Sequence, residues 1–327
     1  MKRLTKIQIL LASYNGEKYI AAQIDSIRSH NSLELSVLIR DDGSTDQTTE
    51  VVEGLIDHDL DLDIQLYNNI SSEKGHCKNF STLCDIATKG DANYFCFSDQ
   101  DDVWAENKID ILHTRMIAME AIHGSDTPIL IHSDLSVVDE NLKEIAPSFI
   151  QYQGLPNPQS HDFPKFLYQN VVTGCTCMFN KALLELASPL PQEVLVHDWW
   201  FALCAQYFGV IDFVNQPLVK YRQHGSNAIG AISGKRKYNF LKPDIYLALL
   251  RFPKHISKSI EQAKILNKLV NERGGNEQAA HAQCINDFSL LKQKNILSRI
   301  AFVHKYIKGN HPTIALIYFY LVFVFFL

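Results

Sequence analysis

The amino-acid sequence predicts an α/β fold, in which a mostly parallel sheet is flanked by helices and followed by a helical, basic C-terminal extension. Two observations carry this prediction. Short apolar runs alternate with stretches of helical periodicity through the first 135 residues, and the connections between them are short. Such an alternation implies right-handed crossovers and helices on both faces of the sheet.

The expected elements follow one another along the chain. Strands are expected where apolar residues run together, at residues 7–12, 37–39, 64–67 and 94–97. Helices are expected where apolar residues recur at helical spacing, first Ile20, Ile24 and Ile27 and then Phe80, Leu83, Cys84 and Ala87. Prolines interrupt residues 140–195, which predicts a loop-rich stretch, and the chain is expected to be helical from Ile245 onward.

Polar residues gather where the expected strands end. Asp41 and Asp42 follow the second strand, and Asp99, Asp101 and Asp102 follow the fourth. Because ligands bind beyond the carboxyl ends of parallel strands, the first cluster is a candidate for contacting a nucleobase and the second for holding a divalent cation. The alternative for both clusters is a solvated acidic turn that caps the next helix.

Two further polar clusters lie later in the chain. In the His-Asp-Trp-Trp segment at residues 197–200, Asp198 is either a general base in a partly desolvated place or a helix cap beside core tryptophans. In the loop at residues 221–227, Arg222 can bind phosphate and His224 can add a nitrogen ligand to a metal. A lone histidine is more often structural, so His224 depends on the other clusters for support.

The order of these motifs resembles the inverting family-2 glycosyltransferases with the GT-A (Rossmann-like) fold, particularly the rhamnosyltransferase-like members of bacterial surface-polysaccharide pathways. The matching motifs lie at residues 10–17, 40–46, 99–104, 173–175, 197–200 and 221–227. The resemblance implies a catalytic domain at residues 1–230, with a nucleotide-binding half at about 1–135 and an acceptor-side half at about 136–230. Residues 231–327 then form a helical basic C-terminal region.

The resemblance also implies a role for individual residues. It implies that the nucleotide sugar is bound by Ala12, Ser13, Tyr14, Glu17, Asp41, Asp42, Lys78, Asp99 and Arg222. Asp101 and His224 are implied to hold Mn²⁺ or Mg²⁺, and Asp198 is implied to be the catalytic base. His197 stands where the family more often has Glu. A histidine at this position is implied to be a feature of the rhamnosyltransferase-like branch. Which of Asp41 and Asp42 faces the base remains open.

The implied reaction moves a sugar, with rhamnose as the first choice, from a dTDP- or UDP-sugar to a hydroxyl of a saccharide acceptor. The resemblance implies an acceptor linked to polyprenyl diphosphate, in O-antigen, capsule or cell-wall polysaccharide synthesis. Transfer of galactose, glucose or an N-acetylhexosamine remains open. A non-catalytic nucleotide-sugar-binding protein and a metal-dependent phosphohydrolase are the alternatives from other functional classes.

Charge divides the chain into two parts. Residues 1–219 hold 14 basic and 31 acidic residues, a balance of −17, whereas residues 220–327 hold 17 basic and 5 acidic residues, a balance of +12. Residues 314–327 carry no charge, but this run is shorter than the ~20 residues that cross a bilayer as a helix. It is either a buried C-terminal helix or a segment that associates with an anionic membrane surface.

Composition also predicts a location. The seven cysteines form no CxxC pair, and charged and polar residues interrupt any signal-like apolar core after Met1. Reduced thiols in the cytoplasm are therefore expected, with the protein peripheral to the inner face of the plasma membrane. No nucleic-acid-binding motif accompanies the basic region, so nucleic acid is not an expected partner.

Overall fold

The computed structural model describes residues 5–28, 33–58, 62–225, 231, 243–274, 279–307 and 320–325. Its strands are β1 (Lys6–Ser13), β2 (Glu34–Asp41), β3 (Asp63–Asn68), β4 (Tyr94–Asp99), β5 (Val103–Trp104), β6 (Ile129–Val138), β7 (Glu144–Ala146), β8 (Cys177–Asn180) and β9 (Val210–Arg222). Its helices are α1 (Ile20–Arg28), α2 (Thr48–His58), α3 (His76–Ala87), α4 (Lys108–His123), α5 (Phe149–Gln153), α6 (Phe163–Phe166), α7 (Lys181–Ala187), α8 (His197–Phe208), α10 (Pro243–Arg273), α11 (Ala279–Ser289) and α12 (Ile296–Tyr306).

The strands form one sheet in the order β3-β2-β1-β4-β8-β6-β9-β5, with β7 beside β6. The first four strands in this order are parallel. Beyond them the sheet is mixed, because β8 runs antiparallel to both β4 and β6 while β6 and β9 are parallel. The expected α/β fold is confirmed, and the four strands predicted from apolar runs form its parallel part.

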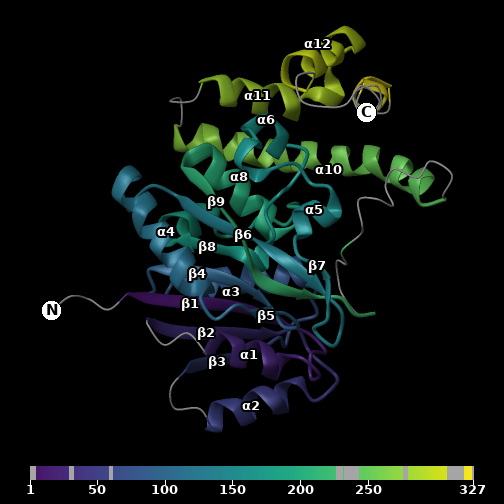
Figure 1. Ribbon diagram of the computed structural model, residues 1–327. Helices are drawn as coiled ribbons and strands as arrows, with labels where there is room; N and C mark the ends of the chain where they lie inside the picture. Colours follow the sequence, from purple (N-terminus) through teal and green to yellow (C-terminus); the bar gives the residue numbers. More distant parts are fainter. Residues whose placement is uncertain are drawn as a thin grey trace.

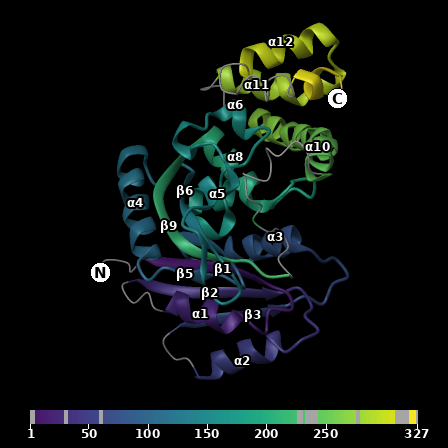
Figure 2. The same cartoon turned by 45° about the vertical axis from the view of Figure 1, so that its right-hand side comes forward.

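Helices cover both faces of the parallel strands (Figures 1 and 2). Helices α1 and α2 lie on one face, and α3 and α8 lie on the other. Successive residues of a strand point to opposite faces. Accordingly Leu10 and Phe97 pack in one core cluster with residues of α3 and α8, while Ile9 and Leu11 pack in a second cluster with residues of α1 and α4. Burial on both faces explains why the first strand reads as a continuous apolar run.

Several boundaries differ from the sequence prediction. The stretch at residues 140–195 contains the short elements β7, α5, α6, α7 and β8 among its loops. The first residues of the motif at 221–227 belong to β9, which runs from Val210 to Arg222. The polar loop after this strand therefore begins at Gln223, so Arg222 is held within the sheet.

The C-terminal helices are packed on the part of the chain that contains the sheet. Buried residues of α10, α11 and α12, including Ile260, Phe288 and Phe302, belong to the same hydrophobic cluster as Phe201 of α8. The helical C-terminal region is thus confirmed, and it shares one core with the rest. Most of the uncharged run at 314–327 lies outside the described residues. Within residues 320–325, the side chains of Val322, Phe323 and Val324 are buried. This burial agrees with the alternative of a buried C-terminal helix for these residues.

Candidate active site

The carboxyl ends of β1, β2 and β4 bring the polar clusters together. In the parallel register Ser13 of β1 pairs with Asp41 of β2, and Ala12 pairs with Asp99 of β4. Three sequence motifs that are 28 and 58 residues apart along the chain therefore meet at one edge of the sheet. Ala12 and Ser13 are themselves buried, at 8% and 2% exposed, so their backbone and neighbouring loop form the floor of this edge.

Asp41 organises the loop that follows β2. Its carboxylate accepts hydrogen bonds from the backbone N–H of Gly43 and Ser44, at 2.9 and 2.7 Å, and from the hydroxyl of Ser13 at 3.1 Å. The side chain is only 1% exposed. Backbone donors to a carboxylate fix a turn firmly because they satisfy amides that would otherwise need solvent. Asp41 therefore holds the loop in place from within the protein.

Asp42 connects β2 to the segment before α3. Its carboxylate accepts from the backbone N–H of Gly75 at 2.7 Å, from Asn69 Nδ2 at 2.8 Å and from Arg40 Nη1 at 3.2 Å. Asp42 is 5% exposed. Both carboxylates of the Asp-Asp pair are thus bound to the protein's own donors, and Asp42 is the one whose partners come from three different segments.

The loop after β1 is fixed by the middle residue of the acidic motif. Gln100 accepts a hydrogen bond from the backbone N–H of Tyr14 at 2.8 Å and donates to the Tyr14 carbonyl at 2.9 Å. A Cβ at Gly16 would lie 2.2 Å from Gln100 Oε1, so a larger residue there would displace the Gln100 amide from these two bonds. The Glu17 carboxylate accepts from the backbone N–H of Gln47 at 2.8 Å. The Tyr14 ring is half exposed, and Lys74 Nζ lies 5.7 Å from its centre.

The three carboxylates at the end of β4 contact three different partners. Asp99 Oδ1 lies 3.2 Å from His76 Nε2, and Asp101 Oδ2 lies 2.8 Å from His224 Nε2. Asp102 is fully buried and accepts from the backbone N–H of Arg222 at 3.2 Å. Asp101 is also buried, and burial together with the charge of Asp99 raises its pKa, against the effect of His224. A solvated acidic turn is therefore excluded for this cluster.

The Asp101–His224 pair suits a hard divalent cation. It offers one carboxylate oxygen and one imidazole nitrogen in contact, both on side chains that are largely buried, at 13% and 10% exposed. Ligand atoms of Asp99, Asp102 and Cys175 also lie within 4.8 Å of one another. Burial raises the pKa of the Cys175 thiol well above its ordinary value, and soft thiolates are poor ligands for Mg²⁺ or Mn²⁺. The oxygen and nitrogen donors fit these ions better than the set that includes the thiol.

Arg222 is held by the protein around the acidic loop. Its Nε donates to the Asp101 carbonyl at 2.8 Å, and its Nη1 donates to the Glu140 carbonyl at 2.6 Å. The guanidinium also lies 4.6 Å from the centre of the Tyr19 ring. These contacts position the backbone of Asp101, while a direct contact of Arg222 with phosphate remains a prediction.

Asp198 lies in the first turn of α8. Its Oδ2 accepts from the backbone N–H of Gly174 at 2.9 Å, and its Oδ1 accepts from Asn170 Nδ2 at 3.1 Å. Burial raises the pKa of Asp198 to about 6, and the charge of Asp99 acts in the same direction. A carboxylate with a pKa near neutrality, held by two hydrogen bonds, has the properties of a general base.

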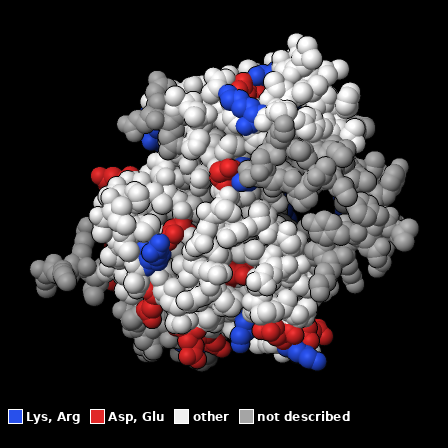
Figure 3. Space-filling model, turned by 45° about the horizontal axis from the view of Figure 1, so that its top comes forward, with Lys and Arg blue, Asp and Glu red and all other residues white. Residues whose placement is uncertain are grey.

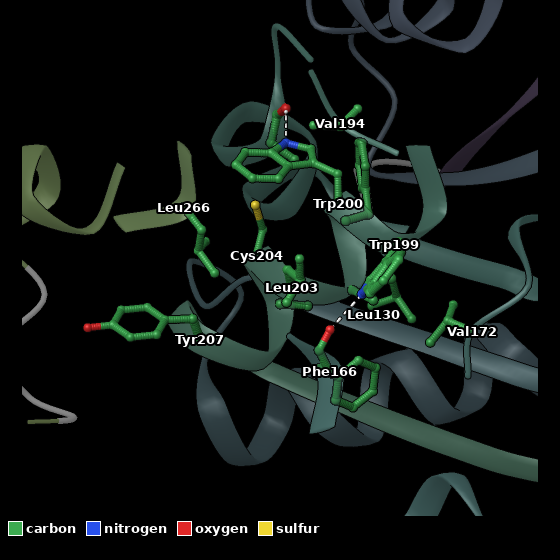
Figure 4. Close-up of a cluster of buried hydrophobic side chains, with 14 of the residues drawn as sticks. Leu130, Phe166, Val172, Val194, Trp199, Trp200, Leu203, Cys204, Tyr207 and Leu266 are labelled. Atoms are coloured by element: carbon green, nitrogen blue, oxygen red, sulfur yellow. Dashed lines mark hydrogen bonds between the residues drawn. The ribbon is translucent and has the colours of Figure 1, made fainter. Parts of the chain in front are cut away.

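The side chains around Asp198 form the core. Trp199 Nε1 donates to the Phe166 carbonyl at 2.7 Å, and Trp200 Nε1 donates to the Ala187 carbonyl at 2.9 Å (Figure 4). Both indoles are 2% exposed, so the tryptophans are core residues, which is one of the two alternatives that the sequence left open. They anchor α8, and the anchored helix fixes where the Asp198 carboxylate lies.

His197 packs among aromatic rings. Its ring stacks on Phe80, with 3.8 Å between centroids, and meets Phe97 edge to face at 4.6 Å. Neither ring nitrogen has a hydrogen-bond partner among the described residues. Burial lowers the pKa of His197 well below its ordinary value, so the ring is neutral. A Glu in this position would bury a charge in an apolar cage, which explains why a neutral ring suits this chain.

The site geometry agrees with what comparison with known proteins shows. The family model "Glycosyl transferase family 2" matches residues 8–183. Over 244 residues the chain is 30% identical to the dTDP-rhamnosyl transferase RfbG of Shigella flexneri, an alignment that covers 71% of this chain and 78% of that relative. The chain belongs to glycosyl transferase family 2.

Two further comparisons place this glycosyltransferase among its relatives. Over 104 residues, 32% of its length and 38% of the relative's, it is 30% identical to the Escherichia coli UDP-Glc:alpha-D-GlcNAc-diphosphoundecaprenol beta-1,3-glucosyltransferase WfaP. The crystal structure of S. aureus TarS in complex with UDP-GlcNAc superposes with a TM-score of 0.52 at 17% identity, covering 91% of this chain and 84% of that one. The structural likeness confirms the GT-A fold.

Sequence reasoning missed some residues that shape the site of the glycosyltransferase. His76 and Asn170 contact predicted site residues, although nothing in their local sequence pattern marks them. Gln100 is the middle residue of the acidic motif, but its bonds to Tyr14 have no signal in the sequence. Lys78, which the resemblance implies for nucleotide binding, pairs with Glu73 at 2.9 Å in the structure and is 42% exposed. The remaining residues of the loop at 221–227, Ser226 and Asn227, lie outside the described part of the chain.

Proposed function

We propose that this family-2 glycosyltransferase moves rhamnose from dTDP-rhamnose to a hydroxyl of a lipid-linked saccharide, with inversion at the anomeric carbon. The observation that carries the proposal is Asp198, a partly buried carboxylate with a pKa of about 6, on which the charge of Asp99 in the acidic loop acts. Nucleotide capture alone needs no such group, so its presence favours an enzyme over a binding protein.

The proposed reaction is a single displacement. The acceptor oxygen forms a bond to the anomeric carbon while the bond from that carbon to the diphosphate oxygen breaks, and dTDP leaves with that electron pair. Asp198 accepts the hydroxyl proton as the new bond forms, which turns a poor nucleophile into an effective one. The hydrogen bonds from Gly174 and Asn170 orient the carboxylate and hold it ionised above pH 6. Attack opposite the leaving group inverts the anomeric centre.

Asp101 and His224 would hold Mn²⁺ or Mg²⁺, because they supply the oxygen and nitrogen donors described above. When bound, such an ion neutralises negative charge on the diphosphate. Arg222 keeps the backbone of Asp101 in place through its bond to the Asp101 carbonyl. Asp99 and the loops after β1 and β2 would hold the nucleoside, with the half-exposed Tyr14 ring as a stacking surface for the base.

The relatives support the choice of donor and acceptor. The most extensive match among those described is a dTDP-rhamnosyl transferase, and a shorter match acts on a diphosphoundecaprenol-linked sugar. On this basis rhamnose from dTDP-rhamnose is proposed as the donor sugar and a polyprenyl-diphosphate-linked saccharide as the acceptor. Residues 1–230 would carry the chemistry, in O-antigen, capsule or cell-wall polysaccharide synthesis.

The C-terminal region would contact the membrane that holds this acceptor. Within the described ranges, no helix is both long enough and apolar enough to span a bilayer. Helix α12 nevertheless exposes Ile296, Leu297 and Ile300, at 52%, 78% and 37%. Arg299 Nη1 donates to the Val324 carbonyl at 3.2 Å, which brings the 65% exposed Phe325 to the same end of the molecule.

This end of the molecule shows mostly uncharged atoms (Figure 3). Lys292 and Lys294 are paired with acidic residues of the same region, whereas Lys305 is exposed on α12. Exposed apolar side chains beside a lysine are the composition of a surface that rests on an anionic bilayer. A location at the cytoplasmic face of the plasma membrane is therefore part of the proposal.

The test is release of nucleoside diphosphate from a panel of sugar nucleotides, with Mn²⁺ and with or without a polyprenyl-diphosphate-linked saccharide. Release from dTDP-rhamnose that depends on the acceptor is the expected result. Acceptor-dependent release from a UDP-sugar instead would replace rhamnose by that sugar. Release that does not depend on the acceptor indicates a phosphohydrolase, and binding without any release indicates a non-catalytic protein.

A further inference from the structure

His76 is the first residue of α3 and lies where three parts of the site meet. The preceding residue, Gly75, has a φ of 124° and donates its backbone N–H to Asp42 at 2.7 Å. This φ is one that residues other than glycine rarely adopt. The start of α3 is therefore fixed to the nucleotide-binding loop after β2, and the position of the His76 side chain is fixed with it.

The His76 ring is oriented by its neighbours. Nε2 lies 3.2 Å from Asp99 Oδ1, the ring meets Phe80 edge to face at 5.0 Å, and its centroid lies 5.2 Å from that of His197. The side chain is still 36% exposed. The contact with Asp99 is made by Nε2, and the other ring nitrogen, Nδ1, of this partly exposed side chain is the polar atom that a ligand can reach.

The position of this ring relates it to the transferred sugar. In the proposed reaction the phosphate side of the sugar faces Asp101, and the opposite side faces the acceptor hydroxyl at Asp198. The sugar has to lie between these two carboxylates. The His76 ring contacts Asp99 and lies 5.2 Å from the ring of His197, the residue before Asp198, so it lies beside the space between these carboxylates. The ring nitrogens of His197 are buried, and the exposed Lys78 is paired with Glu73, so neither offers a comparable donor there.

We propose that His76 is a specificity-determining residue, whose imidazole hydrogen-bonds a hydroxyl of the sugar that the enzyme transfers. The inference rests on the proposed function, since it requires a nucleotide sugar in this site. The bond to Asp99 sets the orientation of the ring, and the sugar hydroxyl contacts the ring's other nitrogen. A sugar whose hydroxyl at that position points away loses this bond and leaves the nitrogen unpaired, which is how a polar site discriminates between isomers.

The test compares the nucleotide sugar with the nucleotide alone. The His76→Phe variant keeps a ring of similar shape against Phe80 and His197 but removes both nitrogens. Dissociation constants for dTDP and for dTDP-rhamnose are measured by titration calorimetry with Mn²⁺. We expect the variant to bind dTDP within about twofold of the wild type and dTDP-rhamnose about tenfold more weakly, the worth of one hydrogen bond. His123→Asn, an exposed histidine of α4, is the matched control.

Two outcomes would overturn the inference. Equal weakening of both ligands would show that the ring acts on the nucleotide through Asp99, and unchanged binding of both would show that it contacts no ligand. Thermal unfolding of each variant monitors the fold, and His76→Asn provides a second variant if the phenylalanine does not fold. If the wild type prefers another sugar nucleotide, the same pair of titrations is made with that donor and its nucleotide, so that a wrong donor and a wrong role for His76 are distinguished.

Discussion

Replacing Asp198 by Asn separates chemistry from stability in this enzyme. The carboxylate is partly buried, and its pKa of about 6 lies roughly two units above the ordinary value of 3.8. At about 1.4 kcal/mol per unit, burial costs the ionised form on the order of 3 kcal/mol. The amide is neutral at every pH and avoids this cost, but it cannot accept the acceptor's proton. We expect transfer to fall by about 10²–10⁴-fold.

The sign of the stability effect follows from the direction of the pKa change. Because the pKa of Asp198 is raised on folding, the carboxyl costs nothing below pH 3.8, and its cost grows between pH 3.8 and pH 6 and stays constant above pH 6. The Asn variant should therefore gain stability over the wild type at pH 8 and gain much less at pH 4. The gain should be smaller than 3 kcal/mol, because one amide oxygen cannot replace both carboxylate oxygens that accept from Gly174 and Asn170.

The assay measures initial rates of dTDP release at saturating donor and acceptor, with thermal unfolding of both proteins at pH 4 and pH 8. His76 on α3 and Asp99 on β4 are charged groups that face Asp198. In the wild type, kcat/KM should rise with pH through about 6 and then level off, as the base ionises. Asp126→Asn, an exposed substitution of the same type, should change neither quantity. Transfer by Asp198→Asn within threefold of the wild type would refute the base assignment.

Three further predictions concern the metal, the loop beside the base and the membrane surface. The Asp101→Ala variant should lose at least tenfold in Mn²⁺-dependent binding of dTDP, measured by calorimetry, and identical titrations with and without chelator would argue against a metal there. The Gly174→Ala variant should lose about 1–3 kcal/mol by denaturant unfolding, because the new Cβ would lie 2.7 Å from His197 Nε2 in a packed cage; an unchanged midpoint would show that the ring moves freely. Replacing Leu297 and Ile300 by Ser should reduce flotation with anionic vesicles several-fold without changing transfer to a short soluble acceptor, whereas equal flotation would remove this surface from the account.

The parallel half of the fold could be predicted because its signals are local. Strands β1, β2 and β4 are mostly buried on both faces and therefore appear as short apolar runs, and their carboxyl ends carry the polar motifs. Parallel register then brings Asp41 and Asp99 to neighbouring strand ends without further information. The nucleotide side of the site follows from this reasoning alone.

The mixed half of the sheet could not be predicted in the same way. Strand β6 contains Ser133 and Asp134, polar residues that interrupt its apolar pattern although they are buried. The structure satisfies them through partners such as the Ser148 hydroxyl, which donates to Asp134 at 2.5 Å from 14 residues away. A pairing at that separation leaves no periodic signal in the sequence.

Lys108 is a residue near the site whose burial could not be predicted from the sequence. A lysine in the first turn of a helix is expected on the surface, yet Lys108 is fully buried behind the acidic loop. Its Nζ donates to the Cys175 carbonyl at 2.8 Å and lies 3.1 Å from the centre of the Trp104 ring. Burial lowers its pKa to about 8. Folding brings both partners to Lys108, so the sequence pattern around it does not predict these contacts. The same holds for the contacts of His76 and Asn170.

The proposed function depends on a single displacement at the anomeric carbon, with Asp198 as the base. The most direct measurement is the NMR spectrum of the isolated product, in which the anomeric signals of the transferred sugar report its configuration relative to the donor. A product with inverted configuration, formed by the wild type and not by Asp198→Asn, is the predicted result. A product with retained configuration would contradict the single displacement, because retention requires a different reaction path.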